Sequence, residues 1–247
     1  EALRASYDKI FHAEFLKAMS KEFEDHSSRN HWSIHLRSSI PPHKLKDNVI
    51  SAVWSMKRKR MPGTGEILKY KARLCANGSQ QTENVNYWDT YSPVVKWLSV
   101  HIMLTLAVIE DLHSRSVDFV LAYPQADIDV DIYMELPPGI VVDGFARKDL
   151  LLKLERNLYG LKQGGYNWFE CLKKGLLARQ FTPSASDLCI YLKKNIVVLV
   201  FVDDCLIFTR HKPLADALIA DLQTEFILTD EGSIATYLGI DVQRTPE

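Results

Sequence analysis

The sequence predicts an α+β fold in which helices alternate with short strands and at least one antiparallel hairpin. Apolar residues recur at helical spacing in several windows, and short β-branched runs lie between these windows. Turn residues such as Pro62-Gly63 separate neighbouring runs. The strands and helices do not follow the regular order of a doubly wound parallel sheet. We therefore expect one domain over residues 1–247, without internal repeats or low-complexity linkers.

The composition is that of a globular protein, with 47% hydrophobic residues, 25% charged residues and a net charge of −1. The apolar runs at 102–109 and 196–202 are far shorter than the roughly 20 residues of a membrane span, and no signal-peptide or lipidation pattern is present. We expect no membrane association. The chain begins without Met, and we expect it to be a piece of a longer protein. No C-x-x-C pair occurs among the scattered cysteines, which favours reduced thiols in an intracellular compartment: Cys75, Cys171, Cys189 and Cys205.

Positive charge is concentrated between residues 44 and 78, a segment that contains nine Lys and Arg residues and only two Asp and Glu residues. A local excess of this kind sets the field that a polyanion meets, so the segment is a candidate phosphate-binding surface. A solvated hairpin or a localisation-like basic tract explains the same composition. Taken alone, the charge pattern favours these simpler explanations.

In the first half of the chain, we expect a helix at 10–23 and a long basic hairpin formed by strands at 49–57 and 67–76. Ser92 is the expected N-cap and Pro93 the first residue of a helix that ends near Ile109. This helix carries an apolar stripe at Leu98, Ile102, Leu106 and Ile109. His31 and His35 have i,i+4 spacing, but no third ligand lies nearby. We expect them to be partly exposed structural histidines.

Further strands are expected at 116–120, 132–136 and 151–154. A helix follows Gly164-Gly165, with Trp168, Leu172 and Leu176 on one face. Apolar runs at 196–202 and 205–208 form a second hairpin. Pro213 opens another helix with four aligned apolar residues: Leu214, Leu218, Leu222 and Phe226. A turn at 230–232 then leads into a last strand at 237–242.

The dipeptide Asp203-Asp204 joins the two strands of the second hairpin. Adjacent carboxylates between buried strands repel each other and lose hydration unless a cation compensates them. A surface turn is the commonest explanation of such a pair. Here both flanking runs have the composition of core strands, and Asp118 ends another short strand. Three carboxylates on neighbouring strand ends could hold two divalent cations and catalyse phosphoryl transfer.

Seven segments in order resemble the signatures of the reverse transcriptase domain of copia-type (Pseudoviridae) LTR retrotransposons. They extend over almost the whole chain: YKARL at 70–74, YSPVVK at 91–96, VDFVLAY at 117–123, YMELPPG at 133–139, LYGLKQ at 158–163, FVDD at 201–204 and YLGI at 237–240. The resemblance implies a right-hand polymerase with basic fingers and an antiparallel palm sheet backed by helices. Residues 1–112 would be mostly fingers with the fingers–palm helix, residues 113–247 mostly palm, and the thumb short or absent.

The resemblance also implies residue roles. Asp118, Asp203 and Asp204 match the catalytic, metal-binding aspartates, which hold two Mg²⁺ ions with Mn²⁺ as an alternative. Tyr123 matches the aromatic residue under the sugar of the incoming nucleotide, where a 2′-hydroxyl does not fit. Three further residues match substrate-binding positions: Lys71 and Arg73, which grip the triphosphate in the fingers, and Gln163, beneath the nucleotide and template base.

The chain departs from the family pattern at three places. Gly164-Gly165-Tyr166 replaces Ala-Pro-Arg and is expected to loosen the start of the helix beside the nucleotide. Asn77 stands where lysine is common, and Cys205 stands where an aliphatic residue is usual. None of these changes removes a metal ligand.

The expected activity is RNA- and DNA-directed DNA synthesis from a primer, with deoxynucleoside triphosphates as substrates. The expected partners are an RNA or DNA template with its primer and other regions of a Gag-Pol-type polyprotein, such as RNase H and integrase. By the same resemblance, we expect cytoplasmic virus-like particles and nuclear delivery of the DNA product. Two alternatives stay open: a non-catalytic nucleic-acid-binding remnant of a retrotransposon, and another palm-type nucleotidyl enzyme such as a cyclase.

Overall fold

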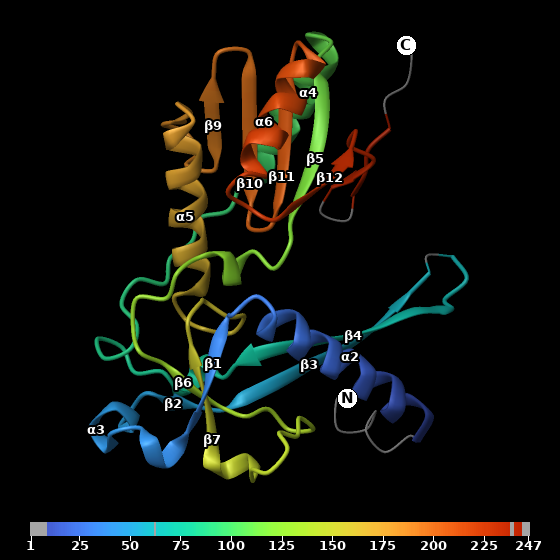
Figure 1. Cartoon of the computed structure of the whole chain (residues 1–247). Coiled ribbons are helices and arrows are strands. Elements are labelled where there is room, and N and C mark those ends of the chain that lie inside the picture. Colours follow the sequence, from blue (N-terminus) through green and yellow to red (C-terminus); the bar gives the residue numbers. More distant parts are fainter. Residues whose placement is uncertain (1–8, 62, 238–239, 244–247) are drawn as a thin grey trace. The chain divides into compact units, whose positions relative to one another are not determined.

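The computed structural model describes residues 9–61, 63–237 and 240–243, which form a mixed α+β structure with several sheets (Figure 1). The α+β class predicted from the sequence is confirmed. The chain divides into two compact units. Unit 1 comprises Glu1–Thr90 and Ala126–Asn167, and unit 2 comprises Tyr91–Gln125 and Trp168–Glu247.

In unit 1, a mixed sheet has the strand order β1-β7-β6-β2, and β3 pairs with β4 in a separate antiparallel hairpin. Buried apolar residues of both sheets form one cluster, which includes Ile50, Leu74, Met134 and Leu152. The described elements of this unit are α2 (Lys9–Ser27), β1 (Trp32–Leu36), η1 (Arg37–Ser39), α3 (Pro42–Leu45), β2 (Val49–Ile50), β3 (Ala52–Arg60), β4 (Ile67–Ala76), η2 (Gly78–Gln80), β6 (Tyr133–Glu135), η4 (Arg147–Asp149) and β7 (Leu150–Leu154).

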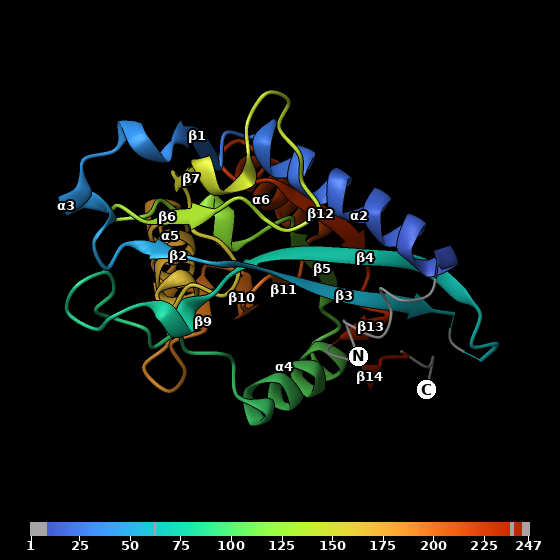
Figure 2. The same ribbon diagram turned by 90° about the horizontal axis from the view of Figure 1, so that it is seen from below.

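The basic hairpin and the N-terminal helix, both predicted from the sequence, are confirmed. Figure 2 shows α2 running alongside β4, and the ring of Phe15 meets that of Tyr70 edge-on at 5.1 Å between centroids. Alternate residues of β4 are buried, as expected for a strand with one covered face. The basic side chains of β4 therefore lie on the opposite, more accessible face.

In unit 2, an antiparallel sheet has the strand order β12-β5-β11-β10-β9-β8. The described elements are α4 (Trp97–Ile109), β5 (His113–Phe119), η3 (Tyr123–Gln125), β8 (Thr182–Pro183), β9 (Ile190–Lys193), β10 (Ile196–Phe201), β11 (Asp204–Thr209), α6 (Lys212–Leu222), β12 (Leu228–Gly232), β13 (Thr236–Tyr237) and β14 (Ile240–Asp241). Helix α5 (Gly164–Ala178) begins in unit 1 and continues into unit 2. The predicted strand–turn–strand around Asp203 is confirmed as β10 and β11.

The central strands of this sheet have two different faces. Leu172 and Leu176 of α5 and Leu222 of α6 surround a small cavity together with Val117 and Cys205 of the sheet, so these helices cover one face. Side chains alternate along a strand, so residues 114, 116 and 118 of β5 and their partners 208, 206 and 204 of β11 lie on the other face. Asp118 and Asp204 are therefore on the face opposite α5 and α6.

Helix α4 differs from the prediction in its start and in its buried face. It begins at Trp97, so Ser92 is not its N-cap and Pro93 is not its first residue. The carboxylate of Asp187 accepts hydrogen bonds from the Lys96 backbone N–H (3.0 Å) and the Ser99 hydroxyl (2.6 Å), which satisfies the first turn from outside the helix.

The stripe expected on α4 exists, but it faces solvent. Leu98 and Ile109 are each 69% exposed and Ile102 is 50% exposed, whereas the buried residues of the helix are Val100, Met103 and Ala107. Because α4 contains no Asp, Glu, Lys or Arg, its sequence offers two apolar faces and does not decide which one is buried.

Two predictions near the C-terminus are also corrected. Residues 230–232 are not a turn but the end of β12, where the pairing with β5 has a register shift between Asp230 and Gly232. Asp230 also accepts a hydrogen bond from the Arg115 guanidinium of β5. The last strand is replaced by the short hairpin of β13 and β14. Leu238 and Gly239 of the YLGI motif lie outside the described residues.

Of the two histidines expected to be partly exposed, His35 on β1 is half-buried, as predicted, whereas His31 differs. His31 lies just before β1. His31 is buried, with its Nδ1 atom 2.8 Å from Nδ1 of His26. Burial and the neighbouring His26 lower the pKa of His31 to about 4. The structural role is retained, but His31 is more deeply buried than expected.

Candidate active site

The carboxylates of Asp118 and Asp204 lie at the same end of unit 2's sheet. Asp118 is the penultimate residue of β5, Asp204 is the first residue of β11, and the antiparallel register places them directly opposite each other. Opposite residues of an antiparallel pair project from one face with Cβ atoms about 4.5–5.5 Å apart. The pairing of two strands therefore brings together two acids that are 86 positions apart in sequence (204 − 118).

Asp203 lies in the two-residue turn between β10 and β11. Its carbonyl accepts a hydrogen bond from the backbone N–H of Phe119, at 2.8 Å, so the turn is attached to the residue that follows Asp118. The preceding Val202 has φ of +54°, in the left-handed region. This conformation is rare for a β-branched residue and costs about 1–3 kcal/mol. The turn is thus strained at the point where it carries an acid.

The electrostatics of this strand end favour a cation. Burial raises the pKa of Asp204 to about 6, and the charges of Asp203, Asp118 and Glu231 add to the shift. Carboxylate oxygens are the ligands that divalent cations such as Mg²⁺ prefer. The chemistry of these carboxylate donors therefore suits such an ion. In the part of the chain that the structure describes, no group of three or more His, Cys, Asp or Glu residues is arranged to hold a metal.

Tyr123 lies in η3, five residues beyond Asp118, and is half-buried. The turn that carries it is held by a residue that the sequence did not single out. The Gln125 amide nitrogen donates to the carbonyls of Val120 (2.8 Å) and Ile227 (2.9 Å), and its oxygen accepts from the Ile227 N–H (2.8 Å). Only its position two residues after Tyr123 could have suggested this role.

In unit 1, Lys71 and Arg73 are both half-buried on the accessible face of β4. Burial lowers the pKa of Lys71, and the positive charges of Arg73 and Lys59 lower it further. The Arg73 guanidinium stacks over the ring of Tyr159, with Cζ 4.1 Å from the ring centroid. The backbone keeps this partner in place, because the Ala76 N–H donates to the Tyr159 carbonyl at 2.8 Å.

The LYGLKQ segment is closely packed against the end of β4. A Cβ atom on Gly160 would lie 2.2 Å from the Ala76 carbonyl oxygen, and φ of Gly160 is +91°. Both facts require glycine at this position. The glycine of the LYGLKQ motif is therefore explained by packing within unit 1.

Gln163 is 2% exposed. Its amide oxygen accepts from the Gln81 side chain at 2.9 Å, and its amide nitrogen donates to the Asn86 carbonyl at 3.3 Å. The side chain therefore connects the LYGLKQ segment to the loop at 81–86. Its predicted contact with nucleotide stays a prediction. Helix α5 begins at Gly164, so Gly164-Gly165-Tyr166, which replaces the usual Ala-Pro-Arg, forms its first turn. The expected loosening of this turn stays a prediction.

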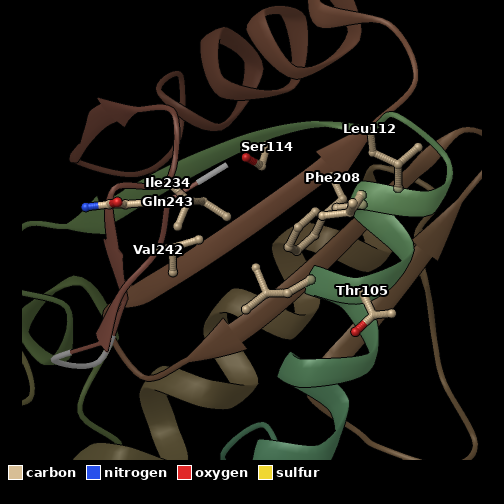
Figure 3. A pocket seen from close by; sticks show the side chains of 10 residues that line it. Thr105, Leu112, Ser114, Phe208, Ile234, Val242 and Gln243 are labelled. Carbon is tan, nitrogen blue, oxygen red and sulfur yellow. The ribbon is translucent and has the colours of Figure 1, made fainter. Parts of the chain in front are cut away.

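A separate cavity of about 320 Å³ lies on the same face of unit 2's sheet as the aspartates. Figure 3 shows its lining, with Phe208 and Ser114 of the sheet, Thr105 of α4 and Val242 near the C-terminal end. Ser114 is four residues from Asp118 along β5, or about 13 Å at 3.3 Å per residue. The described residues that line this cavity include no ionisable side chain, so the cavity itself offers no acid or base.

A family model described as reverse transcriptase (RNA-dependent DNA polymerase) matches residues 41–247. The chain belongs to this family. The similarity also extends to curated retrovirus-related Pol polyproteins from plant transposons. The TNT 1-94 polyprotein of Nicotiana tabacum is 32% identical over 237 residues, which is 94% of this chain and 17% of the relative.

The polyprotein from transposon RE1 of Arabidopsis thaliana is 31% identical over 233 residues, 93% of this chain and 15% of the relative. That from transposon RE2 of the same plant is 30% identical over 235 residues, 94% of this chain and 16% of the relative. The resemblance to copia-type retrotransposon reverse transcriptases is confirmed. The chain spans about one sixth of these relatives.

The raised pKa of Asp204 leads to a prediction about stability. The folded protein binds the Asp204 proton more tightly than the unfolded chain, so stability rises as the pH falls from 7 towards 4. In metal-free buffer at pH 7, Asp204→Asn should raise the free energy of unfolding by about 1 kcal/mol, allowing for solvent screening.

Denaturant titrations should show this gain vanishing below about pH 4, where wild-type Asp204 is protonated in both states. Asp129→Asn, at an exposed acid in unit 1, serves as the control and should change stability little. A destabilised Asp204→Asn variant at pH 7 would show that the three carboxylates do not repel one another.

Proposed function

We propose that this chain extends a primer with deoxynucleoside triphosphates on an RNA or DNA template, as the reverse transcriptase region of an LTR retrotransposon polyprotein. One observation carries the proposal: Asp118 and Asp204 face each other across β5 and β11, and Asp203 lies in the adjoining turn. Family membership supplies the reaction class.

In this proposal, Asp118, Asp203 and Asp204 hold two Mg²⁺ ions, with Mn²⁺ as an alternative. When bound, such ions activate the primer 3′-hydroxyl and stabilise charge on the leaving pyrophosphate. In this proposal the chain contributes three carboxylates, of which Asp204 resists ionisation. Because the pKa of Asp204 is raised to about 6, a cation that binds there competes with a proton at pH values where an ordinary aspartate is already ionised.

Lys71 and Arg73 are the proposed cations that bind the triphosphate, as the family resemblance implies. The Arg73 guanidinium can form paired hydrogen bonds to phosphate. Its stacking on Tyr159 already restricts the side chain, so less conformational entropy is lost when phosphate binds. Lys71, two residues away on the same face of β4, adds a second positive charge. Burial and the neighbouring cations lower the pKa of its ammonium group. Gln163 supports the nucleotide by fixing the LYGLKQ segment.

Tyr123 is proposed to lie beneath the deoxyribose and to exclude a 2′-hydroxyl. Its support is the Gln125 side chain, which closes the η3 turn onto the backbone of Ile227. A ring on a fixed turn discriminates by volume, whereas a mobile ring would yield to the larger sugar.

We further propose that residues 1–112 are mostly fingers with the fingers–palm helix and residues 113–247 mostly palm, with the thumb short or absent. Template, primer, RNase H and integrase regions are the proposed partners, in cytoplasmic virus-like particles that deliver DNA to the nucleus. Among the described helices, none combines the length and apolarity needed to cross a bilayer.

Primer extension on an RNA template is expected to distinguish catalysis from binding. Asp203→Asn should lower kcat by at least about 1,000-fold, because a lost ligand removes charge stabilisation in the transition state. Primer-template affinity should change by less than about threefold, since phosphate contacts dominate it. Asp129→Asn should match wild type in both assays. Equal extension by Asp203→Asn and wild type would overturn the proposed function.

A second prediction concerns sugar selection. Tyr123→Val should raise the incorporation of ribonucleotides relative to deoxyribonucleotides by about 100-fold or more, because a steric barrier is removed. Tyr123→Phe keeps the ring and should retain wild-type discrimination. Competition between rNTP and dNTP in single-nucleotide extension measures both. Unchanged discrimination in Tyr123→Val would assign Tyr123 to the core alone.

A further inference from the structure

Trp168 of α5 makes a hydrogen bond that its packing alone does not explain. The side chain is 1% exposed, and its ring meets those of Phe119 at 5.1 Å and Phe226 at 5.9 Å between centroids. Its indole N–H donates to the carbonyl oxygen of Val202 at 2.7 Å. A buried indole N–H needs an acceptor. Here the acceptor belongs to the turn that carries Asp203.

The position of this acceptor gives the bond its consequence. The Val202 carbonyl belongs to the peptide before Asp203, and the Asp203 carbonyl, bonded to the Phe119 N–H, belongs to the peptide after it. Both peptide groups that flank the Asp203 Cα are therefore held, the first by the Trp168 side chain and the second by the backbone of β5. Two fixed peptides determine the direction in which the Asp203 carboxylate leaves the backbone.

The strain at Val202 explains why such a hold is needed. Two-residue hairpin turns with positive φ at their first central residue normally have Gly or Asn there. A valine at φ +54° is retained only when the surroundings determine the conformation. Within the described part of the chain, the Phe119 backbone N–H and the Trp168 indole N–H donate hydrogen bonds to the turn's carbonyls. Trp168 acts from the sheet face opposite Asp118 and Asp204.

We propose that Trp168 is a positioning residue for Asp203: its indole N–H holds the strained Val202-Asp203 turn in the geometry required for catalysis. Trp168 does not touch substrate in this account and acts through the turn backbone. The proposal rests on the proposed polymerase function for its kinetic consequence, but the geometric hold can be measured without activity.

The substitution Trp168→Phe keeps an aromatic ring and removes the donor. In single-nucleotide extension, kcat should fall about tenfold, with KM for dNTP within about twofold, since one hydrogen bond is lost. The Mg²⁺ concentration for half-maximal activity should rise severalfold. Leu176→Val, two turns along the same helix, should lower the melting temperature comparably without changing kcat. Unchanged kcat and Mg²⁺ dependence in Trp168→Phe would overturn the proposal.

A double-mutant cycle separates positioning from general packing. Asn tolerates positive φ, so Val202→Asn should relieve the strain, and adding Trp168→Phe should then lower kcat by less than about twofold. The same tenfold loss in both backgrounds would mean that Trp168 supports the core and not the turn.

Amide hydrogen exchange at Asp203 and Asp204, followed by NMR without metal or substrate, tests the hold directly. Exchange should be at least about tenfold faster in Trp168→Phe and unchanged in Leu176→Val. Equal exchange in Trp168→Phe and wild type would refute the hold. If wild type fails to extend primers while Trp168→Phe exchanges faster, the proposed function fails and the hold stands.

Discussion

The backbone pairing of β5 with β11 is the interaction on which the candidate active site depends. It places Asp118 opposite Asp204 and attaches the Asp203 turn to Phe119. The ladder hydrogen bonds must hold these acids together against their own repulsion, which is visible in the raised pKa of Asp204. Neighbouring residues of the same strand pair, such as Leu206 and Phe208, are fully buried and apolar. Their burial offsets the unfavourable electrostatics at the strand ends.

The proposed catalytic aspartates and the side chains that hold their turn lie on opposite faces of unit 2's sheet. Asp118 and Asp204 project from one face of the sheet, while α5 and α6 cover the other. Trp168 reaches the Asp203 turn from the covered face, where its ring is buried against Phe119 and Phe226. Gln125 closes the Tyr123 turn by the same means, a side-chain amide bonded to main-chain groups. Strain and charge are thus concentrated in short turns, and rigid elements hold those turns.

Much of this could be predicted from the sequence because the relevant signals are local. The apolar runs around Asp203-Asp204 and the basic strands at 49–57 and 67–76 are hairpins in the structure. The start of α4 could not be predicted, because its first turn is satisfied by Asp187, 91 residues away. Its buried face could not be chosen either, since both faces are apolar. Trp168 was recognised only as a core residue, because a bond from a side chain to a distant carbonyl leaves no pattern in sequence.

The most direct test of the central claim is the location of divalent-cation binding. Mn²⁺ added to isotope-labelled protein broadens the NMR signals of nuclei close to its site, and carboxylates bind it as they bind Mg²⁺. We expect the backbone signals of Asp118, Asp203 and Asp204 to broaden first, and Asp203→Asn to abolish this effect. Broadening that leaves these three residues unaffected while other acids respond would contradict the account.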